Sequence, residues 1–350
     1  MATDQKKYGI GIVGCGNISD THAEAIMKTP KGQLIAAHSR TDASVNTFCE
    51  KYDITPFTSY EEFLGNPDLD IVVICTPSGT HLDYGKSAAE AGKHVIVEKP
   101  IETTVARGQS LIDSCDKNGV KLAVIYQSRF MDDVMEMKEL IDNQQVGDIF
   151  MASASVKWFR DQEYYSNSSW RGTFALDGGG AVINQSIHTI DLLQWFMGGV
   201  KTISAFKGTF THEGIEAEDN AVACMEFNNG AIGVFEASTS ITPPQDRTVE
   251  VNGTGGTLTL KGEALQKKLS DQEAAGREDD AGEATGAASP LSGMTYQDHK
   301  NQYDAILDAF HHDRVPVVSG KDSLQSLAIV EALYKAADDQ QPVHIRDILT

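Results

Sequence analysis

The stretch "YGIGIVGCGNIS" at residues 8–19 decides the fold. Its apolar run Tyr8–Val13 is typical of a buried strand, and the residues that follow have helical periodicity. Between strand and helix, Gly14, Gly16 and Ser19 follow the spacing G-x-G-x-x-small. The first glycine permits a tight turn, and the second lets a pyrophosphate approach the backbone at a helix N-terminus. This spacing also occurs in purely structural turns, but the strand before it and the helix after it favour dinucleotide binding.

The alternation of strand and helix continues to about residue 125. Ile71–Cys75 is continuously apolar, as expected of a strand that is buried on both faces of a parallel sheet. The sequence "SYEE" at Ser59–Glu62 is a capping box, which marks the start of a helix. We therefore predict an α/β fold whose N-terminal domain, residues 1–125, is a Rossmann domain with a doubly wound parallel sheet.

After residue 126 the pattern becomes typical of a large, mostly antiparallel open sheet. Long strand candidates lie at Gly147–Phe159 and Val200–Phe210, and the turn Asn228–Gly230 joins two further strands into a hairpin. A helix is expected at Ala181–Met197. We predict an α+β domain over residues 126–350 for substrate binding and oligomerisation, with a mobile surface loop at residues 270–292.

Length and charge narrow the function classes. A chain of 350 residues is expected to form two domains. The formal net charge of -21 disfavours binding to nucleic acid or to an anionic membrane. No apolar run is long enough for a membrane span, and the first residues lack a signal-peptide core, so we expect a cytoplasmic protein. The five scattered cysteines predict neither a disulfide framework nor a zinc site, and we expect no bound metal.

The second expected strand ends in His38-Ser39-Arg40. An NAD site usually has Asp or Glu at this point to bind the ribose 2′-hydroxyl, whereas a hydroxyl and a guanidinium can hold a 2′-phosphate. NADP is therefore favoured over NAD as the cofactor. The alternative is that Arg40 is simply a solvated loop residue.

Two other segments follow predicted parallel strands, and the ends of such strands are where ligands bind. The first contains Thr76, Pro77 and His81, and the second is Glu98-Lys99-Pro100. Lys99 would face the crevice, partly desolvated, where its pKa can be lowered, which favours a functional role. From spacing alone, it could equally be a surface lysine in a strand–helix turn.

Taken together, these motifs resemble the glucose–fructose oxidoreductase / inositol dehydrogenase / MocA-like family. The segments "QSRF" at Gln127–Phe130 and "GGGAVINQSIHTID" at Gly178–Asp191 extend the resemblance over nearly the whole chain. It implies an NAD(P)-dependent oxidoreductase of sugars, cyclitols or their derivatives, in which Lys99 assists proton transfer. The expected cofactor contacts are Gly14, Gly16, Asn17, Ile18, Ser39, Arg40, Thr76, Pro77, His81, Glu98, Lys99 and Gln127.

The helix expected at Ala181–Met197 carries a polar stripe. At about 100° per residue, Asn184, His188 and Asp191 point to one side, which faces either water or a ligand. The family resemblance implies that His188 contacts the reacting hydroxyl, and that Asn184 stands where many relatives carry Asp. Because an amide cannot take a proton, we expect His188 to be the catalytic base beside Lys99 and Asn184 to orient the substrate. Asp191 would orient the imidazole or be structural.

Cations and aromatic residues are concentrated between the expected strand and this helix. An aromatic wall with a few cations suits a sugar ring that bears a carboxylate or a phosphate, as in a uronate or a nucleotide sugar, although loop packing would give the same composition. The expected substrate contacts are Lys157, Arg160, Tyr164, Tyr165, Trp170, Arg171, Asn184, Asp191 and Gln127.

The favoured function is hydride transfer between a nicotinamide and a secondary hydroxyl or ketone of such a substrate. One alternative is a glycoside-cleaving enzyme that uses NAD for transient oxidation. A non-catalytic sensor is disfavoured because both Lys99 and His188 are present. The run Ala221–Met225 is almost continuously apolar although one face of its sheet should be wet, so we expect a homodimer or homotetramer formed through this sheet, as the resemblance also implies.

Overall fold

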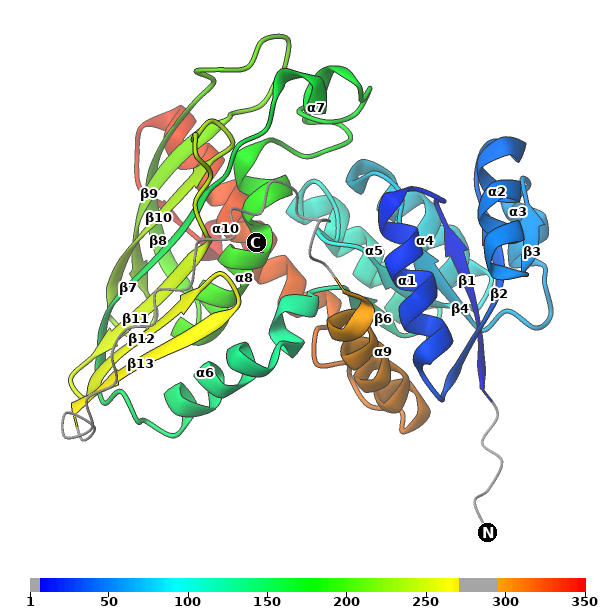
Figure 1. The fold of residues 1–350 in the computed structure, drawn as a ribbon, viewed down its shortest axis with the longest axis horizontal. Helices are drawn as coiled ribbons and strands as arrows, with labels where there is room; N and C mark the ends of the chain where they lie inside the picture. The colour runs from blue at the N-terminus through cyan, green and yellow to red at the C-terminus, as the bar shows by residue number, and fades with distance from the viewer. Residues whose placement is uncertain (1–6, 271–294) are drawn as a thin grey trace. The chain divides into compact units, whose positions relative to one another are not determined.

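The computed structural model describes residues 7–270 and 295–350, which form two compact units (Figure 1). The first unit contains residues 7–127 and 295–324, and the second contains residues 128–270 and 325–350. This corrects the boundary expected from the sequence, because the chain returns to the first unit near its end. The loop expected at residues 270–292 lies almost entirely outside the described residues.

The sheet of the first unit has six parallel strands in the order β3-β2-β1-β4-β5-β6. The strand order reverses between β1 and β4, since β2 and β3 lie on one side and β4 to β6 on the other, so the carboxyl ends of β1 and β4 form the crevice where nucleotides bind in doubly wound sheets. The Rossmann fold predicted from the sequence is confirmed. The strands are β1 (Tyr8–Val13), β2 (Gly32–His38), β3 (Thr55–Phe57), β4 (Ile71–Ile74), β5 (His94–Val97) and β6 (Leu122–Val124).

Helices complete the first unit around a core built mainly from β-branched and leucine side chains. Ser59 is the N-cap expected from the capping box, and its hydroxyl accepts from the Glu62 amide at 3.2 Å. The helices are α1 (Asn17–Lys28), α2 (Asp42–Tyr52), α3 (Tyr60–Leu64), the 3-10 turn η1 (Ser78–Thr80), α4 (His81–Glu90), α5 (Val105–Lys117) and α9 (Tyr296–His311).

Helix α9 is held to the edge strand β6 by one side chain. The Gln302 amide donates to the Val124 carbonyl at 2.8 Å and accepts from the Tyr126 N–H at 3.1 Å. The Gln302 side chain thus supplies both a donor and an acceptor to this edge, as the backbone of a neighbouring strand would. It pairs a backbone carbonyl and a backbone N–H that the sheet edge would otherwise leave unpaired. Leu307 and Phe310 of the same helix are buried in the core that contains β1 and α1.

The second unit is built on an eight-stranded sheet in the order β13-β12-β11-β7-β10-β9-β8-β14. Strands β7 and β10 pair in parallel, and the other recorded pairs are antiparallel, which confirms the mostly antiparallel prediction. The strands are β7 (Ile149–Lys157), β8 (Val200–Gly208), β9 (Asn220–Phe227), β10 (Ile232–Ser238), β11 (Thr248–Gly253), β12 (Gly256–Lys261), β13 (Ala264–Leu269) and β14 (Val343–His344).

Helices cover one face of this sheet, with α8 packed on β7 and β11 (Figure 1). The helix expected at Ala181–Met197 is divided, because its first five residues form a π-helical turn. The helical segments are η2 (Gln127–Phe130), α6 (Asp132–Asp142), α7 (Gln162–Ser166), η3 (Ala181–Gln185), α8 (Ser186–Met197), α10 (Gly320–Asp339), which crosses between the two units, and α11 (Arg346–Leu349).

The other face of the eight-stranded sheet carries exposed apolar side chains. Alternation along β9 buries Ala221, Ala223 and Met225 and leaves Val222 exposed. Register places Phe206 opposite Val222, and Ile232 opposite Met151, on the same open face. The exposed fractions of Phe206 and Ile232 are 74% and 61%.

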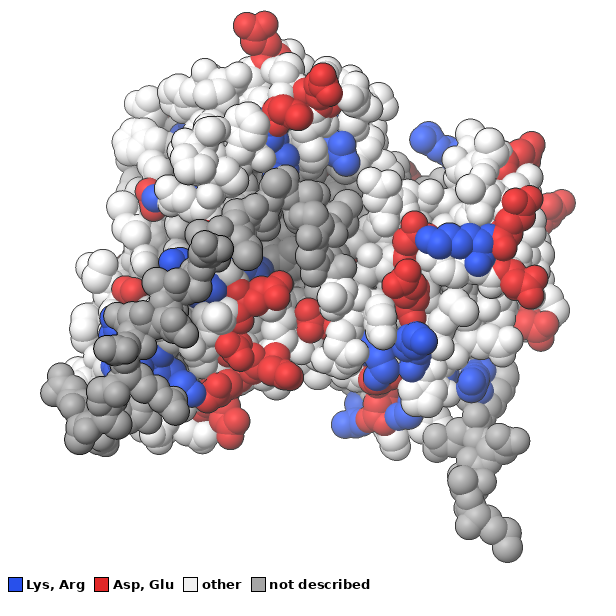
Figure 2. Space-filling view, in the orientation of Figure 1, with Lys and Arg blue, Asp and Glu red and all other residues white. Residues whose placement is uncertain are grey.

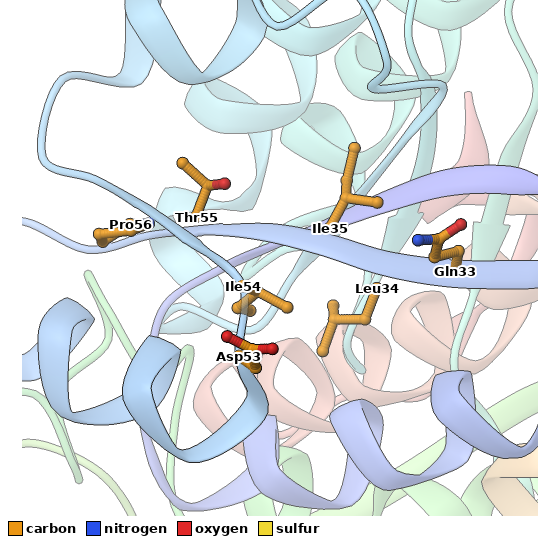
Figure 3. A pocket seen from close by; sticks show the side chains of 7 residues that line it. All are labelled: Gln33, Leu34, Ile35, Asp53, Ile54, Thr55 and Pro56. Atoms are coloured by element: carbon orange, nitrogen blue, oxygen red, sulfur yellow. The ribbon is translucent and has the colours of Figure 1, made fainter.

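Acidic side chains are spread over the surface in Figure 2, as the net charge of -21 requires. None of the described helices is long and apolar enough to cross a membrane. A hollow of about 510 Å³ lies at the amino ends of β2 and β3 (Figure 3). Because nucleotides bind at the opposite, carboxyl ends of such strands, this hollow is not the expected cofactor site. It is lined by Gln33, Leu34, Ile35, Asp53, Ile54, Thr55 and Pro56.

Candidate active site

The glycine turn after β1 has the geometry that a pyrophosphate needs. Gly14 has a φ of +94°, and a Cβ there would lie 2.9 Å from the Cys75 carbonyl oxygen. A Cβ at Gly16 would meet nothing within 4 Å, so open space adjoins the backbone. Gly16 caps α1 without a side-chain hydrogen bond, which leaves the first amides of the helix for an anion. Ser19 is buried and its hydroxyl donates to the Gly16 carbonyl. The turn therefore fits a dinucleotide.

Ser39 and Arg40 follow β2. The Ser39 N–H donates to the Phe57 carbonyl at 3.3 Å, and its hydroxyl has no hydrogen-bond partner among the described residues. Arg40 is exposed, and its guanidinium makes no hydrogen bond or ion pair with any described residue. An unpaired cation at this point can still bind a phosphate.

His81 connects the two motif segments at the carboxyl edge of the sheet. Its Nδ1 lies 3.0 Å from the Pro100 carbonyl oxygen, and its Nε2 lies 2.9 Å from that of Thr76. The side chain is buried, and burial lowers its pKa despite the two carbonyls. His81 therefore braces Thr76 against the Lys99–Pro100 segment, a structural position rather than the cofactor contact expected from the sequence.

Lys99 is the second residue after β5 and is half-buried. Its peptide N–H donates to Oε2 of Glu98 at 3.1 Å. The other carboxylate oxygen of Glu98, Oε1, lies 2.7 Å from Nε2 of His22 on α1. The remaining ring nitrogen of His22, Nδ1, lies 2.7 Å from the Tyr303 hydroxyl on α9. A chain of three hydrogen bonds thus ends on the backbone of Lys99.

His299 on α9 lies against this chain. Its ring is perpendicular to that of His22, with centroids 5.1 Å apart, and neither nitrogen has a hydrogen-bond partner among the described residues. Burial, reinforced by His22, lowers its pKa to about 3, so the ring is neutral. One donor atom each from His22, Glu98 and His299 lies within 4.8 Å of the others. Of the three, only His22 and Glu98 are hydrogen bonded to each other, and His299 packs against His22.

On the helix of the second unit, two of the three residues of the expected polar stripe are accessible. Across Ala181–Met197 the residues that are not buried are Asn184, His188 and Trp195. The Asn184 side-chain amide donates to Asp177 and its oxygen accepts from Gln185 at 2.9 Å, so its orientation is fixed. Asn184 lies in the π-helical turn and His188 in α8, so an unbroken α-helical wheel does not describe their relation.

The π-helical turn is anchored by Glu218. The Glu218 carboxylate accepts from the Val182 N–H at 2.8 Å and from the Tyr334 hydroxyl at 3.0 Å. Burial raises its pKa to about 7. A Cβ at Gly180 would lie 1.9 Å from the Glu218 carbonyl oxygen, so the approach of the two backbones requires glycine. Neither feature can be read from local sequence.

Asp191 is not part of the accessible stripe. Both of its carboxylate oxygens accept from Arg129 at 2.6 Å, and one also accepts from Ser326 at 2.7 Å. Asp191 is 1% exposed and Arg129 is 3% exposed. Asp191 thus neutralises a buried guanidinium, which differs from the substrate contact expected from the sequence.

Two arginines of the second unit have no such acidic partner. Arg160 is 5% exposed, and its guanidinium donates to the Gln185 side-chain oxygen and to the Phe159 carbonyl, each at 2.8 Å. Burial lowers its pKa. Arg171 lies over the Tyr164 ring, with its Cζ 4.2 Å from the ring centroid. Nε of both arginines is buried without a hydrogen-bond partner among the described residues.

The Tyr164 ring also has Arg160 nearby, with its Cζ 5.3 Å from the centroid. The Tyr164 hydroxyl accepts from the Gln185 side chain at 2.8 Å. We call Arg160, Arg171, Tyr164 and Gln185 the arginine cluster. Gln185 joins the arginine cluster to Asn184, a link that sequence reasoning missed.

The structure also places four other residues that the sequence predicts as substrate contacts. Lys157 lies on the open face of the sheet and pairs with Glu236 at 2.7 Å, because strand alternation turns it away from α8. Tyr165 is buried, and its hydroxyl lies 3.1 Å from that of Thr239. Trp170 is half-buried against Arg171, with the guanidinium carbon 5.3 Å from its ring centroid. Gln127, at the end of the first unit, is buried, with its side-chain oxygen unpartnered among the described residues.

Residues 8–126 match an oxidoreductase family with an NAD-binding Rossmann fold, and residues 134–259 match the GFO/IDH/MocA C-terminal domain. A crystal structure of the WlbA dehydrogenase from Bordetella pertussis, in complex with NADH and UDP-GlcNAcA, is 31% identical with a TM-score of 0.85, covering 97% of this chain and 99% of that one. The chain belongs to the GFO/IDH/MocA oxidoreductase family.

Two curated relatives support the assignment to this family. The uncharacterized oxidoreductase YrbE of Bacillus subtilis is 29% identical over 72% of this chain and 73% of its own. The D-glucoside 3-dehydrogenase of Escherichia coli is 26% identical over 70% of this chain and 74% of its own. As a GFO/IDH/MocA oxidoreductase with an NAD-binding domain, the chain is an enzyme.

Within this GFO/IDH/MocA chain, the most informative residues that the sequence did not single out are Gln185, His22 and Tyr303. His22 stands three residues after Ser19, on the helix that the glycine turn opens, so its position was visible. Its partners come from segments 76 and 281 residues away, and no local pattern shows them.

Proposed function

We propose that this family member transfers a hydride between a nicotinamide cofactor and a secondary hydroxyl or ketone of a sugar, a cyclitol or a derivative of either. The observation that carries the proposal is the position of Lys99, which follows β5 at the carboxyl edge of a nucleotide-binding sheet. The names of the two similar dehydrogenases, one crystallised with NADH and a nucleotide sugar, support the substrate class.

The bound nicotinamide would supply the hydride acceptor or donor. During oxidation, the hydroxyl must lose its proton as the carbonyl forms, and neutral His188 is proposed to accept it. Lys99 is proposed to stabilise the oxygen or to relay that proton. Asn184, whose amide is held by Asp177 and Gln185, orients the hydroxyl without taking a proton.

We expect Lys99→Met and His188→Ala each to remove most turnover while NADH still binds, because general acid–base groups contribute about 10²–10⁴-fold. The measurement is initial rate by cofactor absorbance on neutral and acidic sugars, with cofactor binding followed by NADH fluorescence. The matched controls are Lys117→Met and His312→Ala, which change exposed residues. Wild-type rates in either active-site variant would refute its assigned role.

The arginine cluster favours an acidic substrate. Burying a guanidinium is costly unless a carboxylate or other acceptor compensates for it. Arg160 and Arg171 repel each other, and neither forms an ion pair with a described residue. A carboxylate or phosphate on the sugar would accept from the unpartnered Nε groups. We therefore propose a sugar acid, such as a uronate or its nucleotide derivative, as the substrate class.

We expect Arg171→Met to raise KM for a uronate or nucleotide uronate by about ten- to a hundredfold, the usual contribution of a charge-assisted hydrogen bond. KM for the matching neutral sugar should not change, because it lacks the group that Arg171 would bind. Arg346→Met, at a side chain that is 81% exposed in the same unit, is the control. Equal losses on acidic and neutral sugars would contradict an acid-binding role.

We also propose that the enzyme accepts NADP, with Arg40 on the 2′-phosphate. The first two residues after β2, Ser39 and Arg40, are not carboxylates, and the Arg40 guanidinium is unpaired among the described residues. NAD is the alternative, since the similar WlbA dehydrogenase was crystallised with NADH.

For this proposal, Arg40→Ala should weaken NADPH binding by about tenfold or more and leave NADH binding nearly unchanged. Titration of the two reduced cofactors by fluorescence checks it within one protein. The same loss for both cofactors, or for neither, would show that Arg40 does not bind the 2′-phosphate.

The open face of the eight-stranded sheet is proposed to pair with a second copy of this chain. Phe206, Val222, Ile232, Val234 and Met151 form an exposed apolar group across four adjacent strands. Exposed apolar groups of this size usually mark an interface.

We expect light scattering to give a dimer or tetramer for the wild type at micromolar concentration. Ile232→Glu should shift the protein toward monomer, because the interface would have to bury the introduced carboxylate. Val315→Glu, at a residue that is 74% exposed in the first unit, is the control. A wild type that is strictly monomeric would refute the interface.

A further inference from the structure

Gln185 links a buried guanidinium to a buried carboxylate in the second unit. Its side-chain oxygen accepts from Nη2 of Arg160 at 2.8 Å, and its Nε2 donates to the Asn184 side-chain oxygen at 2.9 Å. The Asn184 amide nitrogen in turn donates to the Asp177 carboxylate, which is 2% exposed. Two consecutive residues of the π-helical turn thus carry one line of hydrogen bonds from Arg160 to Asp177.

The direction of this line of hydrogen bonds is fixed by Arg160. A guanidinium has only donors, so the Gln185 oxygen must face Arg160 and the Gln185 amide nitrogen must face away from it. That nitrogen also donates to the Tyr164 hydroxyl at 2.8 Å, so both of its hydrogens are used. A flip of the Gln185 amide would set donor against donor at Arg160 and acceptor against acceptor at Asn184. The Gln185 side chain therefore has a single orientation.

The other contacts of the Arg160 guanidinium are uncharged as well. Its Nη1 donates to the Phe159 carbonyl at 2.8 Å, and its Cζ lies 5.5 Å from the Trp158 ring centroid and 5.3 Å from that of Tyr164. These contacts hold the guanidinium in place without cancelling its charge. Gln185→Glu would keep the shape of the side chain but would pair Arg160 with a carboxylate in a buried site. An acidic ligand would then meet a guanidinium that is already neutralised.

We propose that Gln185 is a positioning residue that sets substrate specificity: its uncharged oxygen holds Arg160 while leaving the charge for the acid of the substrate, and its N–H groups fix Asn184. The inference rests on the proposed function, because it takes Arg160 as the partner of the acid and Asn184 as the residue that orients the hydroxyl. Gln185 acts through these two neighbours, so the two ends of its amide have separable effects.

Two substitutions separate these effects. Gln185→Glu and Gln185→Met both remove the N–H that fixes Asn184, so each should lower kcat by about three- to tenfold, the contribution of one neutral hydrogen bond. Only Gln185→Glu neutralises Arg160, and it alone should weaken the binding of glucuronate, by about ten- to a hundredfold. Gln185→Met should bind glucuronate as the wild type does, since the Phe159 carbonyl and the two rings still hold Arg160.

Calorimetric titration of the NADH-saturated protein with glucuronate and with glucose gives both dissociation constants, because NADH prevents oxidation of the sugar. Initial rates with the oxidised cofactor give kcat. Glucose lacks the acid and should bind the wild type and both variants alike. Gln266→Glu, at an exposed glutamine of β13 in the same unit, is the matched control and should equal the wild type in every value.

An equal loss of glucuronate affinity in Gln185→Glu and Gln185→Met, or no loss in either, overturns this inference, whereas a wild type that prefers glucuronate to glucose keeps the proposed substrate class. An unchanged kcat in both variants overturns the link to Asn184. If Gln185→Glu does not fold, a loss of glucuronate affinity in Gln185→Met is enough to overturn the inference. A wild type that binds glucuronate no more tightly than glucose refutes the acidic substrate class itself, and this inference falls with it.

Discussion

The molecule depends on one constraint, that parallel strands place their carboxyl ends at a single edge of the sheet. The glycine turn after β1, the threonine segment after β4 and Lys99 after β5 meet there for that reason alone. Because β4 and β5 are adjacent, His81 can join Thr76 to Pro100 through both of its ring nitrogens. The edge is therefore a braced structure, and its lysine is fixed by backbone contacts before any ligand binds.

The sequence predicts this first unit well because its signals are local. A strand buried on both faces is a continuous apolar run, and a turn that needs a positive φ shows glycine, as Gly14 does. The return of α9 could not be predicted. Its contacts, from Gln302 to β6 and from Tyr303 to His22, are made by single polar side chains whose partners lie more than 170 residues away.

In the second unit the sequence predicts that cations and aromatic rings gather, but not on which face of the sheet each side chain lies. The composition between Lys157 and Arg171 correctly indicates a cluster of cations and aromatic rings, yet the phase of β7 turns Lys157 to the opposite side. A shift of one residue along a strand reverses the side-chain direction, and the ends of β7 were uncertain by about two residues. Likewise, the helical wheel grouped Asp191 with His188, although Asp191 is committed to Arg129.

Two buried arginines of this unit, Arg129 and Arg160, and the half-buried Arg171 differ in the partners of their guanidinium groups. Arg129 has a bidentate carboxylate from Asp191, which Ser326 supports further, and an aromatic neighbour in Trp195. Arg160 is buried nearly as deeply but receives only neutral acceptors, and Arg171 stacks on the same tyrosine without any acid. A chain with 50 acidic residues and 29 basic ones has no shortage of carboxylates to pair them. In the proposed function, the acid that Arg160 and Arg171 lack among the described residues arrives with the substrate, because a permanent carboxylate here would repel an anionic ligand and leave no group to recognise it.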